Sequence, residues 1–183
     1  MKSKLSIYQI TTIALLTALM CASAFISIPL PFTDVPLTAQ TLMVNLIGMI
    51  LGPVEALLTM VVYVLLGLCG LPVFSGGVGG PAKLFGPTGG YIFSWIIAVV
   101  IISLLKGKKY NFIRYTIVSV AVGFVIIYGL GTLYFMFNMH IGLQPALTMC
   151  VYPYIPLDIA KCVVAALLAK PIQDLLKKVR PQE

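Results

Sequence analysis

Charged residues are scarce in this chain. Of its 183 residues, 12 are Lys or Arg and 5 are Asp or Glu, so charged residues make up 9% of the sequence. A soluble globular domain carries about 25% charged residues, and this chain has too few to cover a water-facing surface. A soluble enzyme or regulator is therefore excluded. The net charge of +7 would indicate nucleic-acid binding only on a soluble basic face, so no nucleic-acid partner is expected.

Residues suited to catalysis and metal binding are equally few. The chain has one His and five acidic residues, whereas an intramembrane enzyme needs a nucleophile with a base, or acidic metal ligands. The cysteines lie in apolar surroundings without metal-binding spacing, and we interpret them as small hydrophobic residues. They are Cys21, Cys69, Cys150 and Cys162. A phosphate-binding P-loop is also missing. The sequence predicts no metal and no cofactor, and any ATP hydrolysis would belong to another subunit.

Long apolar runs are abundant instead. Hydrophobic residues make up 60% of the chain and its mean hydropathy is +1.06, which indicates an integral membrane protein. Because a helix needs about 20 apolar residues to cross a bilayer, the uncharged runs predict six spans. They lie at about 7–28, 37–51, 54–70, 91–105, 115–137 and 156–168. We therefore expect an all-α, multi-pass protein with a single membrane domain over residues 1–183.

The basic residues test this count independently. With six spans and a cytoplasmic N-terminus, ten of the twelve Lys and Arg residues fall on the inner side, as the positive-inside rule requires. They are Lys2, Lys4, Lys106, Lys108, Lys109, Arg114, Lys170, Lys177, Lys178 and Arg180. We predict that both termini are cytoplasmic. A cleavable signal peptide ending near Ala22-Ser23-Ala24 is the alternative for the N-terminus, but its apolar run is long for such a peptide.

Few ionisable residues lie away from the inner side. Asp158 and Lys161 are three residues apart near the start of the last predicted span, and therefore share one helical face near the outer surface. Because burying such groups in a membrane is costly, they are functional candidates. One interpretation is a mutual ion pair that only neutralises both groups. The other is a binding site in which a solute meets Lys161 and donates hydrogen bonds to Asp158.

The first outer connection is rich in proline. Pro29, Pro31 and Pro36 make the segment 29–36 a rigid connector, and we expect Asp34 to lie in its turn. The connector leads directly into a polar stretch that includes Gln40.

The second outer connection, residues 70–91, contains too much glycine and proline to form a continuous helix. Irregular backbone beside a membrane must line a cavity or be buried in protein. We therefore favour a pocket over ordinary connecting loops. Phe74, Phe85 and Tyr91 suit a small ligand with a flat apolar body and polar edges. Lys83, in the same segment, is either solvated or part of that pocket.

Four motifs occur in order along the chain and give it a family resemblance. They are Val35-Pro-Leu-Thr-Ala-Gln-Thr41, Gly70-Leu-Pro-Val-Phe-Ser-Gly-Gly77, Phe85-Gly-Pro-Thr-Gly-Gly-Tyr91 and Ile155-Pro-Leu-Asp-Ile-Ala-Lys161. Together they resemble the BioY family, the biotin-specific substrate-binding (S) components of energy-coupling factor (ECF) transporters. Each motif alone is weak, but the four in register cover nearly the whole chain.

This resemblance implies a fold and a set of partners. It implies a six-helix S-component bundle in the cell membrane of a prokaryote, with an outward-facing biotin pocket. The loop after the first helix, here 29–36, would cover that pocket. A transmembrane coupling subunit (EcfT- or BioN-like) would bind the S component and carry two cytoplasmic ATP-binding subunits (EcfA- or BioM-like). The family's Ala-x-x-x-Ala feature, which contacts the coupling subunit, matches Ala14 and Ala18, and Ala22 extends it.

The resemblance also implies ligand contacts. The family's Asp-x-x-Lys matches Asp158 and Lys161, which it uses to hold biotin. Our hypothesis is that Asp158 accepts from the ureido N–H groups and that Lys161 meets the valerate carboxylate. Gln40, Tyr91 and Tyr152 are further candidates for polar contacts.

The chain departs from the family pattern at Leu157, where members often carry Gly, and at Ser94-Trp95, which replaces a Gly-aromatic pair. Both departures affect the expected pocket shape. An S component for another vitamin is the nearest alternative function, and an intramembrane enzyme is the remaining one.

Overall fold

The computed structural model describes residues 5–31 and 33–179, in which helices dominate. Lys2, Lys4 and Arg180, which were counted on the inner side, lie outside these residues. The helices are α1 (Ile7–Ser23), α2 (Gln40–Ile50), α3 (Pro53–Leu68), α4 (Pro81–Leu84), α5 (Gly89–Leu105), α6 (Phe112–Val122), the π-helical segment η1 (Gly123–Tyr128), α7 (Gly129–Met139), α8 (Leu143–Cys150) and α9 (Ile155–Val179).

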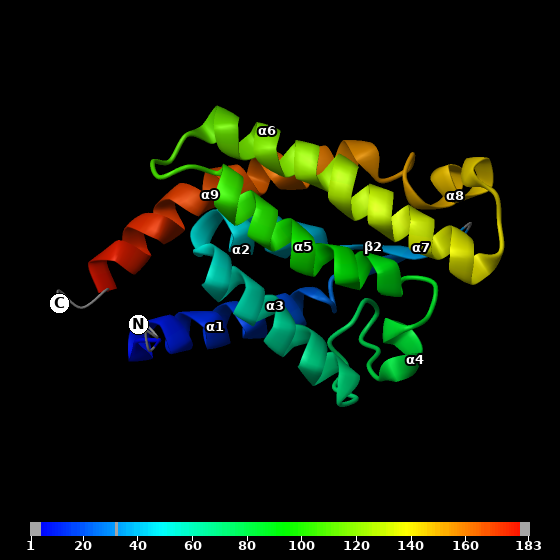
Figure 1. The fold of residues 1–183 in the computed structure, drawn as a ribbon, viewed down its shortest axis with the longest axis horizontal. Helices are drawn as coiled ribbons and strands as arrows, with labels where there is room; N and C mark the ends of the chain where they lie inside the picture. The colour runs from blue at the N-terminus through cyan, green and yellow to red at the C-terminus, as the bar shows by residue number, and fades with distance from the viewer. Residues whose placement is uncertain (1–4, 32, 180–183) are drawn as a thin grey trace.

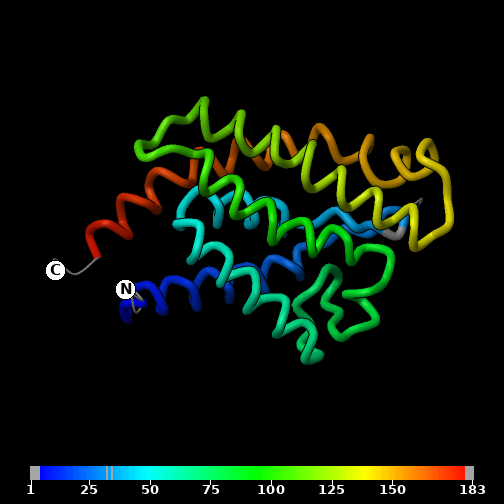
Figure 2. Tube along the Cα trace, viewed as in Figure 1, coloured from blue at the N-terminus to red at the C-terminus, as the bar shows by residue number. Residues whose placement is uncertain are grey.

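Each predicted span contains a helix, although several ends differ from the expected ones. α1 ends at Ser23, short of residue 28, and α9 continues to Val179, well past residue 168. The uncharged run stops at Lys170, but charged residues such as Lys177 and Lys178 are good helix formers and continue the helix. Among the described residues, one stretch, Phe112–Met139, is long and apolar enough to cross a membrane. Figure 2 shows it as one continuous rod built from α6, η1 and α7.

The all-α expectation is corrected by a β-hairpin. Strands β1 (Ser27–Leu30) and β2 (Thr33–Thr38) pair antiparallel, with Ser27 opposite Thr38. The expected connector 29–36 is therefore regular structure, and Asp34 lies within β2 instead of in the turn. The two strands form the whole sheet, so each has a free edge. Prolines, which lack an N–H group, are tolerated at such edges.

The helices run lengthwise, so that the connections gather at two ends of the molecule. The start of α1, the end of α9, the α2–α3 turn and the α5–α6 loop lie at one end (left in Figure 1), which we name the terminal end. The β-hairpin, α4 and α8 lie at the other, the hairpin end. α2 packs against α5 and α9, and α3 packs against α1 and α5. These contacts make α2 and α5 the centre of the core.

Two glycines allow α5 and α7 to pack closely. A Cβ atom on Gly131 of α7 would lie 2.3 Å from the Tyr91 ring of α5, and one on Gly90 of α5 would lie 2.2 Å from Cβ of Tyr134. Each helix therefore presents a glycine to a tyrosine of the other. A Cβ atom on Gly129, by contrast, would have no neighbouring atom within 4 Å. The close approach fixes Tyr91, which lines the site described next.

Candidate ligand-binding site

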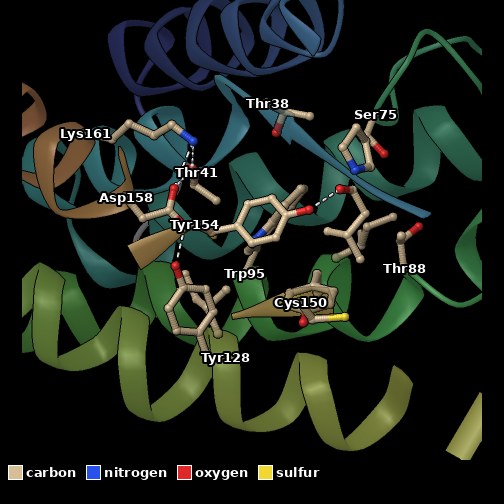
Figure 3. A pocket seen from close by; sticks show the side chains of 15 residues that line it. Thr38, Thr41, Ser75, Thr88, Trp95, Tyr128, Cys150, Tyr154, Asp158 and Lys161 are labelled. Atoms are coloured by element: carbon tan, nitrogen blue, oxygen red, sulfur yellow. Dashed lines mark hydrogen bonds and ion pairs between the residues drawn. The ribbon is translucent and has the colours of Figure 1, made fainter. Parts of the chain in front are cut away.

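A narrow cavity of about 50 Å³ lies at the hairpin end, where β2, α2, α5, η1, α8 and α9 converge with the segments that precede α4, α5 and α9. Its wall combines one acid and one lysine with four aromatic side chains and several hydroxyl-bearing side chains (Figure 3). The charged residues are Asp158 and Lys161, the aromatic residues are Tyr91, Trp95, Tyr128 and Tyr154, and the hydroxyl-bearing residues are Thr38, Thr41, Ser75 and Thr88. Such a mixture suits a ligand with a flat apolar body and polar edges.

Asp158 is the centre of a hydrogen-bond network. Its Oδ1 lies 2.8 Å from Nζ of Lys161, and both side chains are less than 20% exposed. Thr41 of α2 donates to the same Oδ1 at 3.1 Å, and Tyr128 donates to Oδ2 at 2.7 Å. Lys161 also donates to Thr41 Oγ1 at 3.0 Å. Both charged residues stand in the first turns of α9, where a carboxylate is favoured by the helix dipole.

The network leaves bonding capacity for a ligand. A carboxylate has about four acceptor positions and an ammonium has three donors. Asp158 uses three of these positions and Lys161 uses two of its donors. One acceptor and one donor therefore remain. The pair is an ion pair, as one interpretation of the sequence held, but it still has the capacity that the binding interpretation requires.

Tyr128 was not predicted from the sequence as a site residue. It is the last residue of the π-helical segment η1, which interrupts the long helix from Phe112 to Met139. A π-helical turn is wider than an α-helical one and is common at functional sites. This segment packs against α5 and brings the Tyr128 hydroxyl to Asp158. An α-helical periodicity analysis has no signal for such a turn.

Trp95 supplies the pocket with a donor. It is 6% exposed, lines the cavity from α5, and its Nε1 has no hydrogen-bond partner among the described residues. A buried N–H group without a partner costs about 1–3 kcal/mol. A ligand acceptor placed in the cavity would remove that cost. The aromatic residue of the Ser94-Trp95 departure is thus part of the pocket, whereas Leu157 is exposed and does not line it.

The β-hairpin forms one wall of the cavity. Val35 and Pro36 of β2 line it, and the Tyr154 hydroxyl donates to the Val35 carbonyl oxygen. This bond ties the hairpin to the segment just before α9. Of the other predicted lid residues, Pro29 lines a separate outer cavity and Pro31 is exposed.

The structure brings three of the eight predicted ligand residues into the pocket, namely Asp158, Lys161 and Tyr91. Gln40 is fully buried elsewhere, where its Nε2 donates to the Tyr63 hydroxyl at 2.6 Å. Phe74 packs edge-on against the same tyrosine.

The remaining three candidates lie further out. Phe85 is 59% exposed and Tyr152 is 50% exposed, and neither lines the cavity. Lys83 lines the outer cavity beside Pro29 and Pro36. Because Pro36 borders both cavities, the outer one lies directly against the hairpin wall of the pocket.

The alanine row of α1 faces outward. Ala14, Ala18 and Ala22 are all exposed, and their neighbours Leu15 and Leu19 are exposed with them. This face of the helix is therefore available to a partner. Among the described residues, no group of three His, Cys, Asp or Glu side chains is placed to hold a metal ion.

The fold is predominantly helical, and its pocket is suited to a small ligand with an apolar body and polar edges. The chain belongs to the BioY family, whose model matches residues 1–178. The resemblance noted in the sequence is thereby confirmed, and with it the class: a transport component and not an enzyme.

Individual relatives agree with this assignment. The chain is 41% identical over 167 residues to the biotin transporter BioY of Thermotoga maritima, an alignment that covers 91% of this chain and 96% of the relative. It is 38% identical to the probable biotin transporter BioY of Bacillus subtilis, with 94% of each chain covered. The crystal structure of the S-component for biotin from an ECF-type ABC transporter superposes with a TM-score of 0.85, at 27% identity, and covers 91% of this chain and 90% of that one.

Proposed function

We propose that this chain is the biotin-binding S component of an ECF-type uptake transporter in a prokaryotic cell membrane. The observation that carries the proposal is the Asp158–Lys161 pair, which retains one acceptor and one donor inside an aromatic pocket. Similarity to biotin transporters along nearly the whole chain supports the same ligand.

The chemistry of biotin fits the groups present. Its carboxylate is placed at the free donor of Lys161, and its ureido N–H groups at the free acceptor of Asp158. Its apolar bicycle lies among Tyr91, Trp95 and Tyr154. The cavity of about 50 Å³ is smaller than the roughly 300–1,000 Å³ of typical ligand clefts, so the hairpin wall has to move outward when the ligand enters.

Orientation and coupling complete the proposal. In this proposal α1, α2, α3, α5, the α6–α7 rod and α9 each cross the membrane, with the terminal end in the cytoplasm and the hairpin end outside. The basic residues of the terminal end favour this orientation. The exposed row of Ala14, Ala18 and Ala22 supports contact with a coupling subunit, because small residues let a partner helix approach closely. ATP hydrolysis then takes place on two cytoplasmic subunits bound to that partner.

Equilibrium binding to the purified protein in detergent tests the ligand assignment. We expect saturable binding of biotin, and no competition from thiamine or riboflavin. Lys161→Ala is expected to abolish most of the binding, whereas Lys178→Ala, an exposed lysine of the same helix outside the pocket, retains it. Failure of a monodisperse protein to bind biotin, together with saturable binding of another vitamin, would make it an S component for that vitamin instead.

A further inference from the structure

A second cavity, of about 460 Å³, opens at the terminal end. It lies between the start of α1, the α2–α3 turn, the α5–α6 loop and the last turns of α9. Four of its lining residues are lysines and one is an acid: Lys106, Lys108, Lys109, Lys177 and Glu55. The proposed function gives this cavity no role.

The acidic groups near the cavity are already engaged. Glu55 Oε1 accepts from Gln9 Nε2 at 2.7 Å. Asp174 lies 4.0 Å from Lys177, and both of these side chains are largely exposed. Lys108 and Lys109 are exposed on the α5–α6 loop, and neither forms an ion pair within the described part of the chain. The cavity thus has more positive charge than its own acids neutralise.

Lys106 points into the protein at the end of α5. Its Nζ donates to the backbone carbonyl oxygens of Gly48, at 3.1 Å, and of Leu51. Burial lowers the pKa of Lys106 to about 8, and Glu55 opposes this only in part. An anion in the cavity would stabilise the charged form of this lysine.

The surroundings of the cavity match a membrane interface. Tyr8, Tyr110 and Tyr115 line it, and tyrosine is enriched at the level of lipid headgroups. Ile7 is 85% exposed at the start of α1, and Leu105 is 49% exposed where α5 ends. Acyl chains attached to a headgroup in the cavity would lie along such apolar side chains.

We propose that this basic cavity binds the phosphodiester headgroup of an anionic phospholipid from the inner leaflet. Lysine ammonium groups bind phosphate oxygens, and basic pockets between helices on the cytoplasmic side are suited to acidic headgroups. A zwitterionic headgroup adds a cation that the lysines repel. This inference depends on the orientation in the proposed function but not on the identity of the transported ligand.

Lipid occupancy of the delipidated protein tests the proposal. Native mass spectrometry after titration with phosphatidylglycerol or with phosphatidylcholine measures it, in wild type and in two double variants. Lys108→Gln/Lys109→Gln removes two charges from the cavity. Lys170→Gln/Lys178→Gln removes two charges from exposed positions of α9 that do not line it. We expect phosphatidylglycerol to be preferred, and its affinity to fall on the order of tenfold in the first variant only.

Several outcomes would overturn the proposal. Equal affinity for the two lipids, or an equal loss of affinity in both double variants, would show that lipid binding does not depend on this cavity. Displacement of bound lipid by millimolar glycerol phosphate would make a free phosphate ester the ligand. Unchanged lipid binding in the loop variant, with lost assembly onto the coupling subunit, would make the cavity a protein contact. Biotin binding, measured on the same samples, separates these results from a failure of the proposed function.

Discussion

At the residue scale, Asp158 is held by three donors that come from three different elements. Thr41 belongs to α2, Tyr128 to η1 and Lys161 to α9. The carboxylate is therefore fixed in position before any ligand arrives. A ligand that binds to a fixed acceptor loses less conformational entropy than one that must first order a mobile side chain. The remaining acceptor position of Asp158 is therefore available at a defined place in the cavity.

The first prediction concerns the Tyr128 hydroxyl. Tyr128→Phe removes the 2.7 Å bond to Asp158 Oδ2 and keeps the ring. The hydroxyl holds the carboxylate that meets the ligand, and a hydrogen bond to a charged group contributes about 1.5–3 kcal/mol. With Asp158 no longer held in place, biotin affinity should fall about tenfold, as measured by isothermal titration calorimetry. Tyr152→Phe is the matched control, since that half-exposed tyrosine does not line the pocket. Equal effects of the two variants would contradict the role given to Tyr128.

Sequence reasoning found part of this site. Asp158 and Lys161 could be predicted as a pair because a spacing of three residues places both on one helical face. Tyr128 could not be predicted from the sequence, because a π-helical turn changes which face of the helix each residue occupies. Gln40 was misplaced for a different reason. Its partner Tyr63 is on α3, and only the packed structure shows that the amide bonds to protein instead of facing the pocket.

At the scale of elements, the β-hairpin forms one wall of the pocket, and we expect it to control access. The second prediction tests the bond that ties it down. Tyr154→Phe removes the hydroxyl that donates to the Val35 carbonyl oxygen, and a neutral hydrogen bond contributes about 0.5–1.5 kcal/mol. Biotin dissociation, followed by stopped flow, should become about two- to tenfold faster.

Tyr134→Phe provides the comparison for the hairpin variant. It also loses a tyrosine bond to a backbone carbonyl oxygen, that of Phe85 at 3.0 Å, but away from the pocket. Its dissociation rate should equal that of the wild type. A dissociation rate that is unchanged in Tyr154→Phe as well would show that this bond does not restrain the hairpin.

The third prediction concerns the contact between α5 and α7. Gly131→Ala forces a methyl group to within 2.3 Å of the Tyr91 ring, and overpacking of this kind costs about 1–3 kcal/mol. Thermal unfolding in detergent should occur at a lower temperature, and biotin affinity should fall because Tyr91 lines the pocket. Gly129→Ala, with open space at the same position, should change neither. A stable Gly131→Ala protein would mean that the two helices separate easily.

The elements themselves were predictable in different degrees. Uncharged apolar runs located a helix in every predicted span, because the membrane selects for them. The hairpin was missed because the same criterion treats residues 24–28 as a continuation of the first helix. β1 and β2 are only four and six residues long, and each contains a proline, so neither shows the pattern expected of a strand.

At the scale of the whole molecule, the two ends differ in chemistry. Most of the lysines in the described residues belong to the α5–α6 connection and the last part of α9. These segments lie toward the terminal end, whereas the β-hairpin lies at the other end (Figure 1). This asymmetry underlies the proposed orientation. The orientation was predicted from the positions of Lys and Arg alone, because the positive-inside rule concerns the charges of loops and does not depend on packing.

The fourth prediction tests the orientation with a native side chain. Cys69 is exposed and caps the end of α3 that lies away from the terminal end. A membrane-impermeant maleimide should therefore label it in intact cells, and Cys69→Ser should remove most of the labelling. Lys108→Cys in the Cys69→Ser background should be labelled only after permeabilisation. The reverse pattern would invert the protein in the membrane.

The most direct test of the central claim compares biotin with biotinamide, in which the carboxylate is replaced by a neutral amide. Binding of both ligands is measured to the wild type, to Lys161→Met and to Lys83→Met, whose lysine lines the outer cavity instead. If Lys161 holds the carboxylate, the wild type and Lys83→Met should prefer biotin about tenfold or more, and Lys161→Met should bind both ligands within about twofold. An undiminished preference for biotin in Lys161→Met would contradict the assignment of the Asp158–Lys161 pair as the ligand site.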